Sequence, residues 1–291
     1  MFIPYRTETV ITRWPVANIA IIAICVVSFV LLMLGVFPQS LVHAMILNGW
    51  NPVGFLGSQF LHDGIGHLFF NMLFLWVFGN AVCETMGNWR YLGAYFLVGF
   101  ISDAIHVICD GAPAIGASGA INGVVGFYLI LFPTNKVDCF YWFWFRVGTV
   151  EVTGYWLVIL WFLGDVLGAW LGDAGVAYWA HLGGLGAGIA AGVLYETRGW
   201  ATLADYDNPS LITLIFRLKG PEVKKSYKTR EELIREHFAQ QPPSAEVPVE
   251  KPPDVFTVAC PHCNQMLELR ADMIGQTIQC PDCSGEMNVE E

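Results

Sequence analysis

The chain has 291 residues, of which 55% are hydrophobic and only 14% are charged, and its mean hydropathy is +0.50. Soluble globular domains carry about 25% charged residues, so this composition points to a membrane protein. The net charge of −10, with no basic stripe, gives no reason to expect a nucleic-acid partner.

Six apolar segments approach the roughly 17–25 residues that a helix needs to cross a bilayer. They are Asn18–Phe37, Gly66–Glu84, Tyr91–Ile108, Ser118–Pro133, Gly154–Leu171 and Val176–Tyr195. The fourth is short, which predicts that it begins below the membrane surface and is shielded by its neighbours. We therefore predict an all-α membrane fold, with a cytoplasmic segment at 1–17 and a six-helix bundle at 18–198.

Positive charge predicts the orientation of these spans. Basic residues occur at Arg6, Arg13, Arg90, Lys136, Arg146 and from Arg198 onward, whereas loops 38–65, 109–117 and 172–175 contain none. Because Lys and Arg are enriched in cytoplasmic loops, both termini are predicted to be cytoplasmic. The compact six-span form and the lack of targeting signals favour a multi-pass protein of a prokaryotic plasma membrane.

The C-terminal part reads as a separate unit. Residues 199–253 form a cytoplasmic connector that ends in a proline-rich, extended linker. Residues 254–291 contain Cys260-Pro-His-Cys263 and, after sixteen intervening residues, Cys280-Pro-Asp-Cys283. This spacing supplies four thiolates for a tetrahedral structural zinc, and the alternative of two disulfides is disfavoured in a reducing cytoplasm. We predict a zinc ribbon that could dock a cytoplasmic protein partner.

Polar side chains gather where the second, fourth and sixth spans begin. His62 and His67 lead into Asn71 on the second span, Ser118 opens the fourth, and His181 opens the sixth. All three spans run inward, so these groups share one depth near the outer face of the membrane. A nucleophile, a base and hydrogen-bond donors at one level are the components of an acyl-transfer site.

Local spacing supports this assembly. His67 and Asn71 are four residues apart, so they lie on one helical face. Gly119-x-x-x-Gly123 and Gly184-x-x-x-Gly188 make smooth helix faces that let two backbones approach closely. A short serine side chain reaches a histidine on another helix only across such a contact.

Each polar residue also has a structural reading. A lone serine in a membrane helix commonly bonds its own backbone, and a lone histidine bridges helices. Asp103 and Asp165, near the outer ends of their spans, are expected to cap or pair within the bundle. Two other enzyme motifs are excluded, because Ala120 breaks a Gly-x-Ser-x-Gly elbow and no Glu lies between His62 and His67.

The chain resembles the rhomboid family in three motifs that follow one another over residues 18–196. These are His62-x-x-x-x-His67-x-x-x-Asn71, Gly116-x-Ser118-Gly119, and Ala180-His181-x-x-Gly184-x-x-x-Gly188. The resemblance implies a six-helix bundle with a Ser118–His181 dyad that lacks an aspartate. It also implies an oxyanion site built from Asn71, His67 and the backbone N–H of Ser118, and no cofactor for catalysis. The substrate would be another protein's transmembrane segment, cut near its outer end.

Two features depart from the family pattern. The stretch Asn51–Gly57 lacks the Trp-Arg pair that many relatives carry there. Many relatives also place an aromatic ring four residues after the serine, stacked on the histidine, where this chain has Asn122. Asn122 is expected to hydrogen-bond His181 instead, within a cavity lined by His62, His67 and Ser118.

The function expected is therefore an intramembrane serine endopeptidase. The main alternative is an inactive rhomboid-like protein that binds transmembrane helices and hands them to partners. A channel or transporter is disfavoured, because the sequence has no internal repeats or broken half-helices.

Overall fold

The computed structural model describes residues 2–9, 13–171, 175–200, 209–216 and 255–289. It divides into two compact units, Met1–Glu236 and His237–Glu291. The predicted connector and proline-rich linker, residues 199–253, lie mostly outside the described residues.

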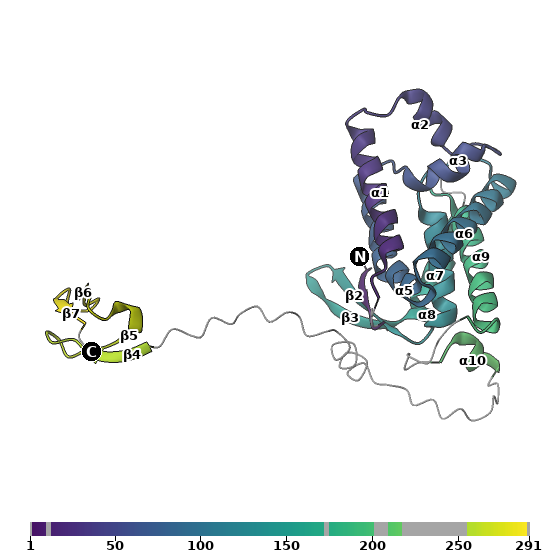
Figure 1. Cartoon of the computed structure of the whole chain (residues 1–291). Helices are drawn as coiled ribbons and strands as arrows, with labels where there is room; N and C mark the ends of the chain where they lie inside the picture. The colour runs from purple at the N-terminus through teal and green to yellow at the C-terminus, as the bar shows by residue number, and fades with distance from the viewer. Residues whose placement is uncertain (1, 10–12, 172–174, 201–208, 217–254, 290–291) are drawn as a thin grey trace. The chain divides into compact units, whose positions relative to one another are not determined.

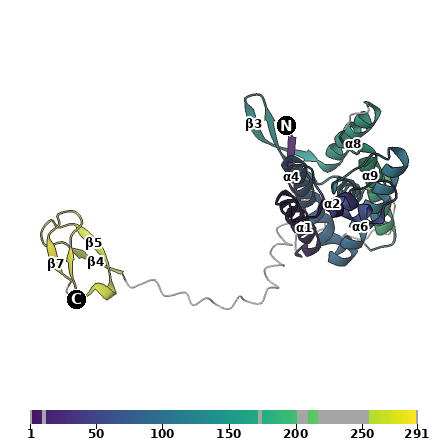
Figure 2. The ribbon, with the colours of Figure 1, turned by 90° about the horizontal axis from the view of Figure 1, so that it is seen from above.

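The first unit is dominated by helices (Figures 1 and 2). The longer ones are α1 (Val16–Met33), α4 (Ile65–Phe74), α6 (Asn88–Cys109), α7 (Ser118–Leu131), α8 (Gly154–Leu171) and α9 (Tyr178–Thr197). The shorter ones are α2 (Gln39–Met45), α3 (Pro52–Gly57), η1 (Ser58–Phe60), η2 (Leu75–Gly79), α5 (Asn80–Met86) and α10 (Leu211–Phe216). α4, η2 and α5 form one continuous segment, Ile65–Met86.

Four helical segments of the described chain are long and apolar enough to cross a membrane. They are Val16–Met33, Ile65–Met86, Asn88–Cys109 and Gly154–Leu171. α7 is apolar but has only 14 residues, which rise about 21 Å and fall short of the roughly 30 Å hydrocarbon layer. α9 has 20 residues, but its glycines and polar ends make it less apolar. Four of the six predicted spans therefore meet the criterion of length and composition.

α7 is the central helix of the unit, and glycines bring it against α9. A Cβ on Gly184 would collide with the carbonyl oxygen of Gly119, and one on Gly188 with that of Gly123. Eleven of the fourteen residues of α7 are buried. The two glycine faces therefore meet as predicted, and no larger residue fits between the backbones.

A buried polar cluster ties α1 to the second and third long helices. Asn18 is fully buried and donates from its side-chain nitrogen to the Leu75 carbonyl and to Asn80 Oδ1, each at 2.8 Å. The Tyr91 hydroxyl donates to Asn18 Oδ1 at 2.6 Å. Leu75 opens the single π-helical turn η2, where backbone carbonyls lose their regular partners. Asn18 thus satisfies a carbonyl that an apolar neighbour would leave unpaired.

The prediction of an all-α membrane unit missed a three-stranded antiparallel sheet. β1 (Phe2–Thr7) pairs with β2 (Lys136–Phe143), which forms a hairpin with β3 (Arg146–Thr153). Strand β3 contains Val147, Val150 and Val152 among threonines, a β-favouring composition in what was read as an interhelical loop. Figure 1 shows the sheet at the end of the bundle where α1 and α8 begin.

The second unit consists of two hairpins, β4 (Val255–Ala259) with β5 (Met266–Arg270) and β6 (Thr277–Gln279) with β7 (Glu286–Asn288). Each hairpin turn holds one Cys-x-x-Cys pair. The residues after these pairs, Asn264 and Ser284, have positive φ angles of 62° and 58°, so both turns reverse in the same way. The small core is formed by Leu267, Leu269, Met287 and Val289 around the cysteines.

Candidate active site

Ser118 is the first residue of α7 and lies at the edge of a cavity. The cavity has a volume of about 330 Å³, and Asn71, Asn122, Asp165 and His181 also line it. Ser118 is partly exposed, and the first backbone N–H groups of α7 have no intrahelical acceptor. The helix N-terminus therefore offers partial positive charge beside the serine hydroxyl.

His181 comes from the first turn of α9, and its partner is a carboxylate on α8. The ring Nδ1 lies 3.0 Å from Asp165 Oδ1, and both side chains are mostly buried, at 16% and 17% exposure. Because Nδ1–H of His181 donates a hydrogen bond to Asp165, neutral His181 carries its lone pair on Nε2. The resemblance implied a dyad without an aspartate, whereas in the structure Asp165 is hydrogen-bonded to His181. Pairing of Asp165 within the bundle was predicted, but this partner was not.

Asn71 provides a hydrogen-bond donor with no partner in the described part of the chain. It is 7% exposed, and its side-chain nitrogen makes no hydrogen bond there. Leaving such a buried donor unpaired typically costs about 1–3 kcal/mol. A donor kept in this state, in the same cavity as Ser118, is suited to bind an anion that forms during a reaction.

The loop before Ser118 passes directly beside His67 and Asn71 on α4. A Cβ on Gly116 would lie 2.6 Å from His67 Nε2 and 3.7 Å from the Asn71 side-chain nitrogen, and Gly116 has φ +122°. Only glycine suits both the backbone conformation and the close approach. The predicted supporting glycine therefore lets His67 and Asn71 come close to the start of α7.

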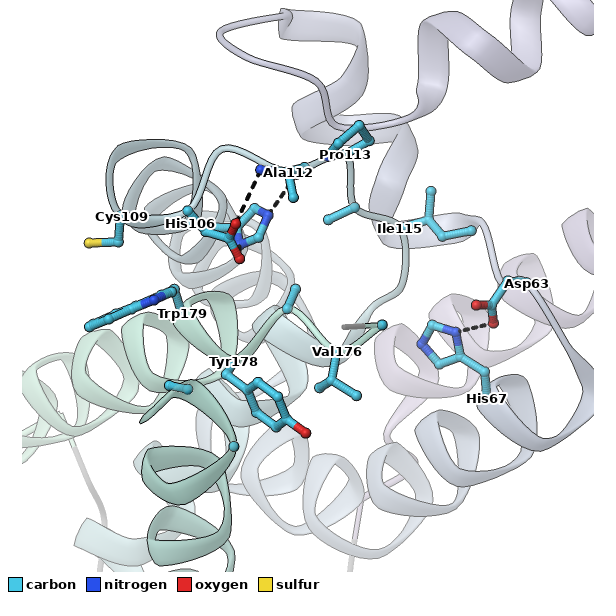
Figure 3. A pocket seen from close by; sticks show the side chains of 16 residues that line it. Asp63, His67, His106, Cys109, Ala112, Pro113, Ile115, Val176, Tyr178 and Trp179 are labelled. Carbon is cyan, nitrogen blue, oxygen red and sulfur yellow. Dashed lines mark hydrogen bonds and ion pairs between the residues drawn. The ribbon is translucent and has the colours of Figure 1, made fainter. Parts of the chain in front are cut away.

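His67 lines a second, larger pocket of about 720 Å³, shown in Figure 3. Its Nδ1 lies 2.7 Å from Asp63 Oδ1, so Nε2 of neutral His67 is an acceptor and becomes a donor only on protonation. Across this pocket lie His106, whose Nε2 is 2.9 Å from the Ala112 carbonyl, and Tyr178.

His62 and Asn122 lie differently from their predicted positions. His62 is fully buried, its ring 5.1 Å edge-on from that of His67, and it lines neither pocket. Burial lowers the pKa of His62, which lies before α4, to about 4. The Asn122 side chain donates to the Ser118 carbonyl at 3.0 Å rather than to His181. An aromatic ring does face the histidine, since Tyr178 lies edge-on to it at 6.2 Å.

Two side chains beside His181, Ser102 and Tyr178, were not predicted from the sequence. The Ser102 hydroxyl donates to the Ala180 carbonyl at 2.7 Å, next to His181, and it sits against Gly119. This bond joins α6 to α9 beneath the site. Tyr178 precedes His181 by three residues on α9, and that helical spacing was the one signal that could have identified it.

The four cysteines of the C-terminal unit converge on one point. Their sulfurs all lie within 4.8 Å of one another, with Cys260 to Cys283 at 3.8 Å and Cys263 to Cys280 at 3.7 Å. A disulfide would need about 2.05 Å, so these are free thiols. Sulfurs at about 2.3 Å from a tetrahedral metal are separated by about 3.8 Å. The residues therefore fit a metal ion, and hydrogen bonding from the backbone of His262 lowers the pKa of Cys260 to about 6.

Apolar helices around a cavity that is lined by Ser118, His181 and further polar side chains define a membrane-embedded helical protein. Residues 49–198 match the family model described as the Rhomboid domain, and the chain belongs to the rhomboid family. It is similar to Rhomboid protein 1, mitochondrial, of Saccharomyces cerevisiae, with 29% identity over 157 residues, 52% of this chain and 42% of the relative.

Two further relatives are bacterial. The Rhomboid protease GluP of Bacillus subtilis is 40% identical over 76 residues, 26% of this chain and 15% of the relative. The Rhomboid protease GlpG of Klebsiella pneumoniae is 25% identical over 145 residues, 50% of this chain and 49% of the relative. The chain spans less than half the length of each of these three relatives. The relatives include both mitochondrial and bacterial proteins, so the comparisons do not support a location in a prokaryotic plasma membrane. That location stays a prediction.

Proposed function

We propose that this protein is an intramembrane serine endopeptidase that cleaves transmembrane segments of other proteins. The observation that carries the proposal is the convergence of Ser118, His181 and Asn71 on one cavity, with Asp165 bonded to the far side of the histidine. The nucleophile, the base, the group that orients the base and an unpaired donor come from four different helices. These segments are far apart in the sequence and meet only in the folded protein. Together they supply the groups that acyl transfer by a serine nucleophile requires.

In this mechanism Ser118 Oγ attacks the scissile carbonyl while its proton passes to His181 Nε2. Asp165 holds Nδ1–H, which keeps the lone pair on Nε2 and stabilises the imidazolium that forms. Asn71 and the N–H groups at the start of α7 donate to the developing oxyanion. His181 then gives its proton to the leaving amine, and the acyl-serine bond remains. A water, deprotonated by His181, hydrolyses that ester and restores Ser118.

We propose that the protein crosses the membrane six times, with α7 and α9 as the shorter or less apolar crossings. In this arrangement residues 18–198 form the membrane domain, both termini are cytoplasmic and the catalytic cavity opens toward the outer face. The pocket beside His67 would bring water to the site. The substrate helix would have to unwind locally, because intact helical hydrogen bonds cover the carbonyls.

Co-reconstitution with a model transmembrane substrate tests this function. Cleavage by the native chain, lost in Ser118→Ala and in His181→Ala, is the expected result. Cleavage that survives in Ser118→Ala would refute the nucleophile assignment.

If the native chain cleaves nothing, a fluorophosphonate probe separates the alternatives. Labelling at Ser118 would keep the protease and implicate the choice of substrate. An unlabelled Ser118 would favour a rhomboid-like protein that binds transmembrane helices without cutting them.

We also propose that residues 254–291 form a zinc ribbon on a cytoplasmic linker, where it could dock a protein partner. Cys260, Cys263, Cys280 and Cys283 would hold the ion, whose role would be to stabilise two hairpins with a very small core. Metal analysis of the full chain should give one zinc per chain, lost in Cys263→Ser. Retention of the metal in that variant would argue against this ligand set.

A further inference from the structure

Six consecutive aromatic residues, Phe140–Phe145, run along the end of β2 and into its turn. Trp142 is 59% exposed, Trp144 78% and Phe145 96%. Side chains of this size normally bury their apolar surface. These form a contiguous exposed cluster, the aromatic tip, with Val147, which pairs directly with Trp142 and is also exposed.

The turn at the aromatic tip is not explained by turn chemistry. Trp144 and Phe145 are the two residues between β2 and β3, and Trp144 has φ +54°. Two-residue hairpin turns favour Asn-Gly or similar pairs, and positive φ is unfavourable for a bulky side chain. The Trp142 indole N–H donates to the Trp144 carbonyl at 2.9 Å, so the one polar atom of that ring is satisfied within the turn. The outward surface is left apolar.

The base of the hairpin is polar, in contrast to its tip. Arg6 bonds Asp138 at 2.6 Å and Lys136 bonds Glu151 at 2.7 Å, so the charges near the bundle pair with one another. The only charged residue among 139–150 is Arg146, beside the tip. The hairpin therefore ends in an aromatic surface with one positive charge.

The hairpin also lies at the level where the helices begin and end. β2 starts five residues after α7, and β3 runs directly into α8 at Gly154. Figures 1 and 2 both show it projecting sideways from the end of the bundle. α8 begins directly after β3, and apolar side chains such as Trp156 and Leu163 are exposed on it.

We propose that the β2–β3 hairpin is an interfacial anchor whose aromatic tip inserts into the lipid headgroup region beside the helix bundle. Tryptophan is enriched at this depth of membranes because its ring is apolar and its N–H is polar. Arg146 complements anionic headgroups at the same level. The occupant is the lipid surface, since the hairpin runs directly into α8, a helix long enough to span the membrane, and so lies beside the level at which that span begins.

Site-specific photo-crosslinking in the full chain tests this proposal. Benzoylphenylalanine replaces Phe145 in protein embedded in nanodiscs of phosphatidylcholine and phosphatidylglycerol, and adducts are identified by mass spectrometry. The exposed Leu163 on α8 serves as the lipid-facing reference and the exposed Asp272 of the C-terminal unit as the aqueous one. Lipid adducts at 145, comparable to those at 163 and absent at 272, are expected. Labelling of 145 no greater than at 272, or cross-links to a second copy of the chain, would overturn the anchor.

A second variant separates lipid contact from folding. Trp144→Asn with Phe145→Gly improves the turn, so the unfolding temperature should stay the same or rise. Lipid adducts from a cross-linker at position 142 should nevertheless fall several-fold in this background. Undiminished adducts would show that the aromatic tip does not hold the hairpin at the membrane.

Discussion

The carboxylate of Asp165 should matter for catalysis because it holds His181 in the reactive tautomer. The bond is 3.0 Å long, and both partners are mostly buried. A hydrogen bond that involves a charged group contributes about 1.5–3 kcal/mol. Since about 1.4 kcal/mol is a factor of ten in rate, Asp165→Ala should lower kcat about 10- to 150-fold. Asp165→Asn keeps an oxygen acceptor without the charge, so its activity should be intermediate.

The assay combines substrate cleavage in proteoliposomes with the rate of fluorophosphonate labelling at Ser118. Both readouts should fall in parallel, because the labelling reaction needs the same proton transfer but no substrate helix. Asp103→Asn is the matched control. Asp103 is a buried acid on α6 that does not line the cavity, so both rates should be retained.

A purely structural role for Asp165 would give a different pattern. It would lower the unfolding temperature and leave the labelling rate of the folded fraction unchanged. If Asp165→Ala stays within about twofold of the native rates in both assays, the positioning role is wrong.

Three further predictions follow from the same structure. Asn71→Ala should lower kcat about 10²- to 10³-fold in cleavage kinetics, because it removes an oxyanion donor. The unfolding temperature should change little, because the side-chain nitrogen of Asn71 makes no hydrogen bond within the described part of the protein. Gly188→Ala should destabilise the protein by about 1–3 kcal/mol in thermal unfolding, because the added methyl group would collide with the Gly123 carbonyl. Gly186 faces open space, so Gly186→Ala should leave the stability unchanged. The free energy of unfolding should be highest above about pH 6.5 and fall toward pH 4. The reason is that His62, with a pKa of about 4 in the folded protein, binds a proton less readily there than in the unfolded chain. The effect is at most about 3 kcal/mol, and His62→Gln should flatten the pH profile of stability.

Motif spacing predicted the parts of the site that lie on single helices. The four-residue step from His67 to Asn71 places both beside Gly116, and the glycine repeats bring α7 against α9. Spacing of this kind is local, so it can be read without knowing how distant segments pack.

Features that depend on packing could not be predicted in the same way. Whether Asp165 faces His181 depends on the rotation of α8 about its axis, which no single-helix pattern determines. The sheet was missed because β1 lies at the N-terminus and pairs with β2 more than 120 residues later. β2, rich in aromatic residues, and β3, rich in valine and threonine, both have β-favouring compositions. They were overlooked because the chain was interpreted as membrane helices joined by loops.

Asp63 changes the role that a motif alone would assign to His67. A histidine four residues before an asparagine suggests two donors for one oxyanion, but Nδ1–H of His67 already donates a hydrogen bond to Asp63. Neutral His67 then presents an acceptor at Nε2, which would repel an oxyanion rather than bind it. In the proposed mechanism, Asn71 and the N-terminus of α7 are therefore the oxyanion donors, and neutral His67 is not. The two motif residues on α4 would thus take unequal parts in the proposed reaction.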